Sequence, residues 1–202
     1  MRKVKPNYTK AIIIVHGKCE LIMCQYIKNN LRLKMEILAD KKGEKSIQIN
    51  SLTNFLNKQG FKSLKQFNSK YDDIEREEDS SPKLKNFKIF TIMDTDDCTL
   101  EQAKAYQNKS MFKTQWFYEY IVPIYDSPDL DSILKKCDVL PNIKIHDKDK
   151  VKTYSKAFPI DKTYKKSDAI QLEEFANQLA KDKNTNLEEF LKYCLESVVD
   201  TR

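Results

Sequence analysis

The chain has 202 residues, of which 40% are hydrophobic and 33% are charged, and it contains only 3 glycines. This length fits one domain with an appended element or two very small domains. The composition excludes collagen-like and low-complexity classes, and the apolar fraction is too high for a disordered chain. We therefore expect a globular protein with a buried core.

No segment is long and apolar enough for a membrane helix. The longest apolar run, Ala11 to Val15, falls far short of the roughly 20 residues that a bilayer-spanning helix needs. The basic stretch before it leads into no signal-peptide core or small-residue cleavage site. We therefore expect a cytoplasmic protein without a membrane partner.

The five cysteines contain no Cys-x-x-Cys pair. An odd set without that spacing supports neither a disulfide framework nor a zinc ribbon. We expect most of these thiols to be small, buried side chains.

The first predicted element is a strand at Ala11 to Val15, whose continuous β-branched sequence is typical of a strand buried on both faces of a parallel sheet. Gly17 ends this strand. From Lys18 onward, apolar residues recur at spacings of three and four, which predicts one buried face of a helix. The residues on this face are Leu21, Cys24, Ile27 and Leu31.

The next predicted elements are a short strand and a helix. The strand covers Met35 to Ala39, and Ser51 is the expected N-cap of a helix that ends near Lys58. Six acidic residues gather between positions 72 and 82, where we expect a solvated loop.

Phe87 to Met93 is the second strongly apolar strand, and it leads directly into Asp94. Thr99 can cap the helix that follows. The aromatic and β-branched residues of Trp116 to Tyr125 predict a further strand, in which Pro123 indicates a sheet edge or a strand end.

Helices are expected to close the chain, with a short one after Pro128 and two amphipathic ones that begin near Ser167 and Asn186. The alternation of strands and helices predicts an α/β fold with a mainly parallel sheet flanked by helices and a helical C-terminal extension. We divide the chain into an α/β domain at residues 1–126 and, at 127–202, a basic segment with C-terminal helices that pack on that domain.

Residues 135–166 carry ten lysines and four aspartates, with little periodicity. This segment is either a solvated loop or a surface that contacts phosphates. Its aromatic residues Tyr154, Phe158 and Tyr164 either stack on nucleic-acid bases or pack against the last helices. The candidate nucleic-acid contacts are Lys148, Lys150, Lys152 and Lys156, together with Lys18 beside the glycine turn.

Two strand ends gather the candidate chemistry, because function in an open parallel sheet lies beyond the carboxyl ends of the strands. The first strand leads into His16, with Glu20 one helical turn on, and the other leads into Asp94, Asp96 and Asp97. These acids are either solvated loop residues or a metal site, in which a cation neutralises their repulsion. Oxygen ligands without clustered cysteine or histidine favour Mg²⁺ or Mn²⁺. In an extended chain Asp94 and Asp96 point to the same side and reach one metal.

These motifs resemble those of a known family. A strand that leads into Val15-His16-Gly17-Lys18-Cys19-Glu20, followed by a strand that ends in Asp94-Thr95-Asp96, resembles the TOPRIM domain over residues 10 to 126. Among TOPRIM proteins the chain is most similar to the compact nuclease branch that includes the RloB-like and OLD-family proteins of bacterial phage defence.

The resemblance implies a nuclease that hydrolyses phosphodiester bonds of DNA or RNA with Mg²⁺ or Mn²⁺. It implies that Glu20, Asp94 and Asp96 are catalytic and bind the metal, with Asp97 as a further ligand. His16 stands where family members usually carry a glutamate. His16 ligates the metal, acts as a base near neutral pH, belongs to a site that has lost activity, or is a strand-end residue bonded to backbone.

The main alternative is a catalytically degenerate TOPRIM-like module that binds nucleic acid or a partner ATPase, since the chain has no phosphate loop of its own. Asp-x-Asp also ends strands in haloacid dehalogenase phosphotransferases, but Cys98 stands where that motif wants threonine or valine. Nothing resembles the sugar-binding complement of a glycosyltransferase. The Ile-Val-His-Gly run resembles the oxyanion strand of α/β hydrolases, but the chain has no Gly-x-Ser-x-Gly elbow.

Overall fold

The computed structural model describes residues 8–78, 83–137, 149–159 and 166–199. Its centre is a four-stranded sheet in which every pair of neighbours is parallel, in the order β2-β1-β3-β4. The strands are β1 (Ala11–Val15), β2 (Met35–Leu38), β3 (Lys88–Asp94) and β4 (Ile121–Asp126). The predicted α/β class with a parallel sheet is confirmed.

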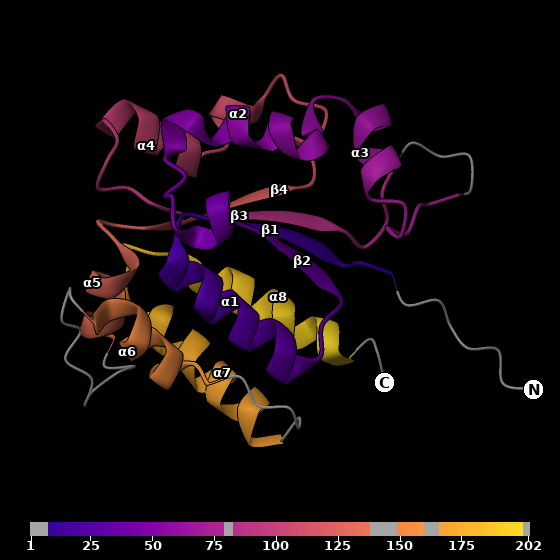
Figure 1. The fold of residues 1–202 in the computed structure, drawn as a ribbon. Coiled ribbons are helices and arrows are strands. Elements are labelled where there is room, and N and C mark those ends of the chain that lie inside the picture. Colours follow the sequence, from indigo (N-terminus) through magenta and orange to yellow (C-terminus); the bar gives the residue numbers. More distant parts are fainter. Residues whose placement is uncertain (1–7, 79–82, 138–148, 160–165, 200–202) are drawn as a thin grey trace, which may run out of the picture.

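Helices cover both faces of the sheet (Figure 1). One face carries α1 (Lys18–Leu31) and the C-terminal helices, which are α5 (Leu130–Lys136), α6 (Lys150–Ala157), α7 (Lys166–Leu179) and α8 (Leu187–Val199). The other face carries α2 (Leu52–Leu56), α3 (Leu64–Lys70) and α4 (Leu100–Gln107). A parallel sheet covered in this way is dry on both sides.

The alternation of side chains along β1 divides the core into two clusters. Ile13 packs with α1, α7 and α8, whereas Ile12 and Ile14 pack with the elements of the opposite face. All five residues of β1 are buried, which explains why its sequence is apolar without interruption. Four of the five cysteines are also buried, as expected.

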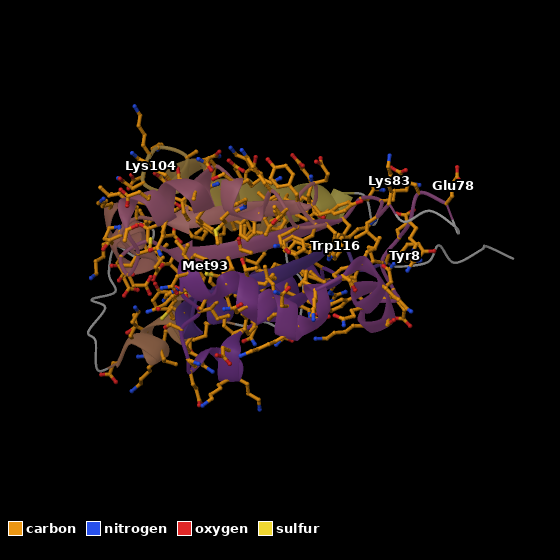
Figure 2. All side chains as sticks on the ribbon, turned by 90° about the horizontal axis from the view of Figure 1, so that it is seen from above. Tyr8, Glu78, Lys83, Met93, Lys104 and Trp116 are labelled. Atoms are coloured by element: carbon orange, nitrogen blue, oxygen red, sulfur yellow. The ribbon has the colours of Figure 1, made fainter. Side chains whose placement is uncertain are left out.

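Two ends of the molecule are distinguished in Figure 2, which places Lys104 of α4 and Tyr8 at opposite ends. Met93, the next-to-last residue of β3, lies toward the end marked by Lys104, which is therefore the end where the strands have their carboxyl termini, whereas Tyr8 precedes β1. The candidate residues that follow β1 and β3 thus share the end marked by Lys104.

The predicted strand at Trp116 to Tyr125 is wrong in its first half. Residues 116–120 form turns, and β4 begins only at Ile121. Trp116 donates its Nε1 hydrogen to the carbonyl of Phe61 at 2.8 Å, and Phe117 is fully buried in the aromatic cluster. These residues have strand-like composition, but aromatic packing and not a sheet ladder is what buries them.

The expectation that Pro123 marks a sheet edge is confirmed, because β4 is the outer strand. The Pro123 carbonyl points away from β3 and accepts a hydrogen bond from Asn186 Nδ2 at 3.0 Å. Asn186 Oδ1 in turn accepts the backbone hydrogen of Tyr125 at 2.9 Å. The Asn186 side chain therefore satisfies two backbone groups of the outer strand, which would otherwise be open to pairing with another strand.

Two other expectations need correction. The helix expected from Ser51 to Lys58 is the short α2, followed by a π-type turn at Asn57–Phe61 in which Gly60 has φ 96°. The basic segment at 135–166 is not without structure, since it contains α6. This helix escaped notice because only Thr153, Tyr154 and Phe158 provide its buried side, too few for a clear apolar period.

The described parts of the chain contain no helix long and apolar enough to cross a membrane.

We predict that Tyr106→Phe destabilises the fold by about 1 to 3 kcal/mol, because it removes a buried hydroxyl that joins two strands. This hydroxyl lies 2.6 Å from the carbonyl oxygen of Thr91 in β3 and 2.8 Å from that of Ile124 in β4. Urea denaturation measures the loss. The control is the same substitution at the half-buried Tyr118, and equal stability of the two variants would contradict the bridging role.

Candidate functional site

The carboxyl ends of β1, β3 and β4 lie side by side at one edge of the sheet. Asp94 is the last residue of β3 and Asp126 the last of β4, and the two are paired in register. His16 follows β1, and its backbone N–H donates to the carbonyl of Ile92 at 2.9 Å. β1 and β3 are parallel neighbours, so the two motifs that follow them meet at this edge.

Glu20 is held by the turn that begins α1. Its Oε2 accepts the backbone hydrogen of Gly17 at 2.8 Å, which closes the first turn of the helix. A Cβ at position 17 would lie 3.3 Å from this oxygen, so the glycine allows the close approach. Glu20 is 3% exposed. Burial raises the pKa of its carboxyl, while His16 and the hydrogen bonds it accepts lower it.

Asp94 is a buried carboxyl at this edge with a strongly raised pKa. Its Oδ1 accepts the backbone hydrogen of Leu130 at 3.2 Å, and Oδ2 lies 3.9 Å from His16 Nε2. Burial, followed by the nearby carboxyls of Glu20 and Asp126, raises the pKa of Asp94 to about 9. A metal-free site therefore favours a proton on this group at neutral pH.

His16 lies between the two motifs, and both its backbone and its side chain are engaged. Its carbonyl accepts the backbone hydrogen of Ile47 at 2.8 Å. This agrees with the interpretation of His16 as a strand-end residue bonded to backbone. The imidazole also faces Asp94, and its Nδ1 is buried with no hydrogen-bond partner in the part of the chain that the structure describes. The side chain is thus placed to act on Asp94 or on a molecule bound beside it.

Asp126 belongs to the same edge and was missed by the sequence analysis. It is 0% exposed, and its Oδ1 accepts the Thr185 hydroxyl hydrogen at 2.7 Å. Its Oδ2 is buried without a hydrogen-bond partner among the described residues. Burial raises the pKa of Asp126 to about 7, and the charge of Glu20 adds to this shift. The signal was available: Asp126 ends an apolar strand, as Asp94 does.

Asp96 and Asp97 do not join the buried group. The expected extended geometry across Asp94 and Asp96 is wrong, because β3 ends at Asp94 and residues 95–97 form a turn. The Thr95 N–H donates to the carbonyls of Asp126 at 3.1 Å and Pro128 at 2.9 Å. Both aspartates are exposed. The charge of Asp96 nevertheless contributes to the raised pKa of Asp94, so Asp96 lies near the buried group.

The side chains are close enough to influence one another but are not gathered around one point. Within the described ranges, no three His, Cys, Asp or Glu side chains are grouped so that they could hold a metal ion. The carboxyls that share the edge are Glu20, Asp94 and Asp126, with Asp96 and Asp97 on the rim.

Lys150 reaches this edge from α6, but as part of an ion pair. Its Nζ lies 2.6 Å from Asp131 Oδ2, and the Tyr154 hydroxyl donates to the other oxygen of Asp131 at 2.5 Å. The positive charge of Lys150 also lowers the pKa of Glu20. Lys150 therefore compensates the carboxyls of the site, which differs from the free phosphate contact expected from the sequence.

The other residues of the basic segment divide into exposed and buried ones. Lys152 and Lys156 are exposed on α6, and Lys148 and Tyr164 lie outside the described residues. Tyr154 and Phe158 are buried, and Phe158 packs against Tyr26 with ring centroids 5.5 Å apart. Of the two interpretations of these aromatic residues, packing within the protein is the one confirmed for Tyr154 and Phe158.

No protein-family model matches this chain, and no curated protein or solved structure is significantly similar to it.

We predict that Asp126→Asn stabilises the metal-free protein increasingly as pH rises. The folded parent holds the Asp126 proton up to about pH 7, whereas the unfolded chain releases it near 3.8. The parent therefore loses stability as pH rises between these values, and the amide does not. The advantage of the variant should grow by about 2 to 3 kcal/mol from about pH 5 to about pH 8.

Urea denaturation in a chelator at both pH values measures this difference. Asp97→Asn, the same change on the exposed turn, is the matched control. An advantage of Asp126→Asn that is constant with pH would contradict the proton linkage.

Proposed function

We propose that the protein is a metal-dependent nuclease that hydrolyses phosphodiester bonds of DNA or RNA. The observation that carries this proposal is the meeting of Glu20, Asp94 and Asp126 at the carboxyl edge of a parallel sheet. Three carboxyls buried together raise one another's pKa and destabilise the fold when they ionise. Such an arrangement is easiest to understand if a cation compensates the charges.

The residues fit a hard divalent cation in their chemistry. All donors are carboxylate oxygens, which Mg²⁺ and Mn²⁺ prefer. The buried Oδ2 of Asp126, without a hydrogen-bond partner among the described residues, is a free ligand atom. To hold the ion, the carboxyls of Glu20, Asp94 and Asp126 would have to move closer together, because they are not grouped around one point, and Asp96 and Asp97 would reach it from the rim by a rearrangement of the turn. When bound, the ion would activate a water molecule and neutralise charge on the phosphate.

The remaining residues of the site have distinct tasks in this proposal. His16, which faces Asp94, accepts a proton from the attacking water or passes one to the leaving oxygen. The Lys150–Asp131 pair joins α6 to α5 and places a positive charge near Glu20. Lys18, Lys152 and Lys156 face solvent at least in part and attract the phosphate backbone.

The alternative function is a TOPRIM-like module that binds nucleic acid or a partner ATPase without cleaving. One observation favours it: the carboxyls of the described residues are not grouped for metal binding, and protons alone could neutralise them. Action in bacterial phage defence, for either function, rests on the resemblance of the Gly17 turn and the Asp94-Thr95-Asp96 motif to that family.

We predict that millimolar Mg²⁺ or Mn²⁺ raises the thermal stability of the protein and supports cleavage of plasmid DNA or structured RNA. At a metal concentration of about 100 times Kd, the stabilisation is about 2.7 kcal/mol. Asp94→Asn keeps the hydrogen bond to Leu130 N but removes the charge, so it should abolish both effects. Equal stabilisation of variant and parent would place the ion elsewhere, and stabilisation without cleavage would favour the binding module.

We predict separate outcomes for two substitutions of His16. His16→Ala should lower the cleavage rate by about 10² to 10⁴-fold, the usual contribution of a general acid or base. His16→Glu should retain or increase cleavage, because it restores a hard oxygen ligand. Cleavage assays with equal amounts of folded protein test both. Robust cleavage by His16→Ala would show that the histidine has no catalytic role.

A further inference from the structure

A lysine-rich loop packs directly on the turn that carries His16 and Glu20. We define the lysine loop as residues 40–45, Asp-Lys-Lys-Gly-Glu-Lys. A Cβ on Gly43 would lie 2.9 Å from the Cα of Lys18 and 3.3 Å from the backbone carbon of Gly17. The loop backbone is therefore in contact with the first turn of α1, and the next segment is tied to it by the hydrogen bond from Ile47 N to the carbonyl of His16.

The backbone of this loop is strained at two residues that are not glycine. Lys41 and Lys42 both have left-handed backbone angles, with φ of 45° and 58°. Non-glycine residues rarely adopt these angles, and two in succession are rarer still. Gly43 follows with φ 85°. Such strain persists only where surrounding contacts hold it, and it concentrates at functional sites.

The contacts that hold the loop leave Lys41 and Lys42, and also the exposed Glu44, without an ion-pair partner among the described residues. Lys18 Nζ donates to the carbonyl of Lys42 at 3.2 Å, and Lys45 forms an ion pair with Asp40 at 3.5 Å. Lys41 and Lys42 are exposed, and no described acidic side chain forms an ion pair with either. The strained backbone thus presents two uncompensated ammonium groups beside a cluster of carboxyls.

We propose that the lysine loop is the surface that binds the sugar-phosphate backbone of a nucleic-acid strand and holds it over the candidate site. This inference deepens the proposed function and rests on it. A site lined by carboxyls repels a polyanion, so a substrate strand needs positive charge close to the entrance. Lys41 and Lys42 supply it from the loop that packs on the first turn of α1, in addition to Lys152 and Lys156 of α6.

Binding of a fluorescein-labelled oligonucleotide in EDTA, followed by anisotropy, tests the proposal without cleavage. The variant is Lys41→Asn/Lys42→Asn, because asparagine tolerates left-handed angles and leaves the loop intact. Binding should weaken on the order of tenfold at about 0.1 M salt, and the slope of log K against log salt should fall by about 1.4 to 1.8. Lys41→Arg/Lys42→Arg should bind like the parent.

The control is Lys62→Gln/Lys65→Gln, which removes the same charge from exposed residues at and before α3. Equal weakening in the control would mean that only net charge matters and would overturn the role of the loop. Unchanged binding and slope in the Asn variant would also overturn it, whether or not the parent cleaves. If the Asn variant loses binding while the parent never cleaves with metal, the loop surface stands and the nuclease function fails.

Discussion

The burial of carboxyl groups at the carboxyl edge of the sheet is the constraint to which the surrounding structure responds. Glu20, Asp94 and Asp126 are each at most 8% exposed, and an ionised carboxylate in such a place is costly unless it is compensated. The neighbouring elements supply what compensation there is. The Gly17 N–H, the Leu130 N–H and the Thr185 hydroxyl each donate to one of the three groups.

The order of strands and helices could be predicted because burial on both faces leaves a clear apolar pattern in a parallel strand. β1 and β3 follow this rule, and both lie inside the sheet. The apolar pattern gave a wrong element, or none, where contacts other than those of a parallel sheet bury the side chains. Residues 116–120 have strand-like composition but form turns, in which Phe117 is buried and Trp116 bonds the carbonyl of Phe61. α6 is amphipathic over too few residues to be recognised. In both cases the deciding contacts join residues far apart in the chain, such as Trp116 to Phe61 and Tyr154 to Asp131.

The candidate site could be predicted only in outline. The rule that chemistry follows the carboxyl ends of parallel strands found His16, Glu20 and Asp94, and applied to β4 it would have found Asp126 as well. The prediction that Asp94 and Asp96 point to the same side was wrong, because it required the strand to continue as far as Asp96. Where a strand ends depends on its neighbours: the Thr95 N–H is shared between the carbonyls of Asp126 and Pro128, and residues 95–97 then turn. The pairing of Lys150 with Asp131 depends on the docking of α6 and has no signature in the sequence.

Protons and cations compete for the same carboxyls, and this competition connects the two proposed functions. The pKa of Asp94 is raised to about 9 and that of Asp126 to about 7, so a cation that binds near neutral pH must displace protons. A nuclease exploits that exchange, because the ion keeps the carboxylates charged and the lysines beside them hold the substrate. A binding module needs no exchange: protonated carboxyls no longer repel a phosphate backbone, and Lys18, Lys41 and Lys42 face it across a nearly neutral edge. The same buried carboxyls thus suit either proposed function, and the affinity of the site for a divalent ion would distinguish between the two proposals.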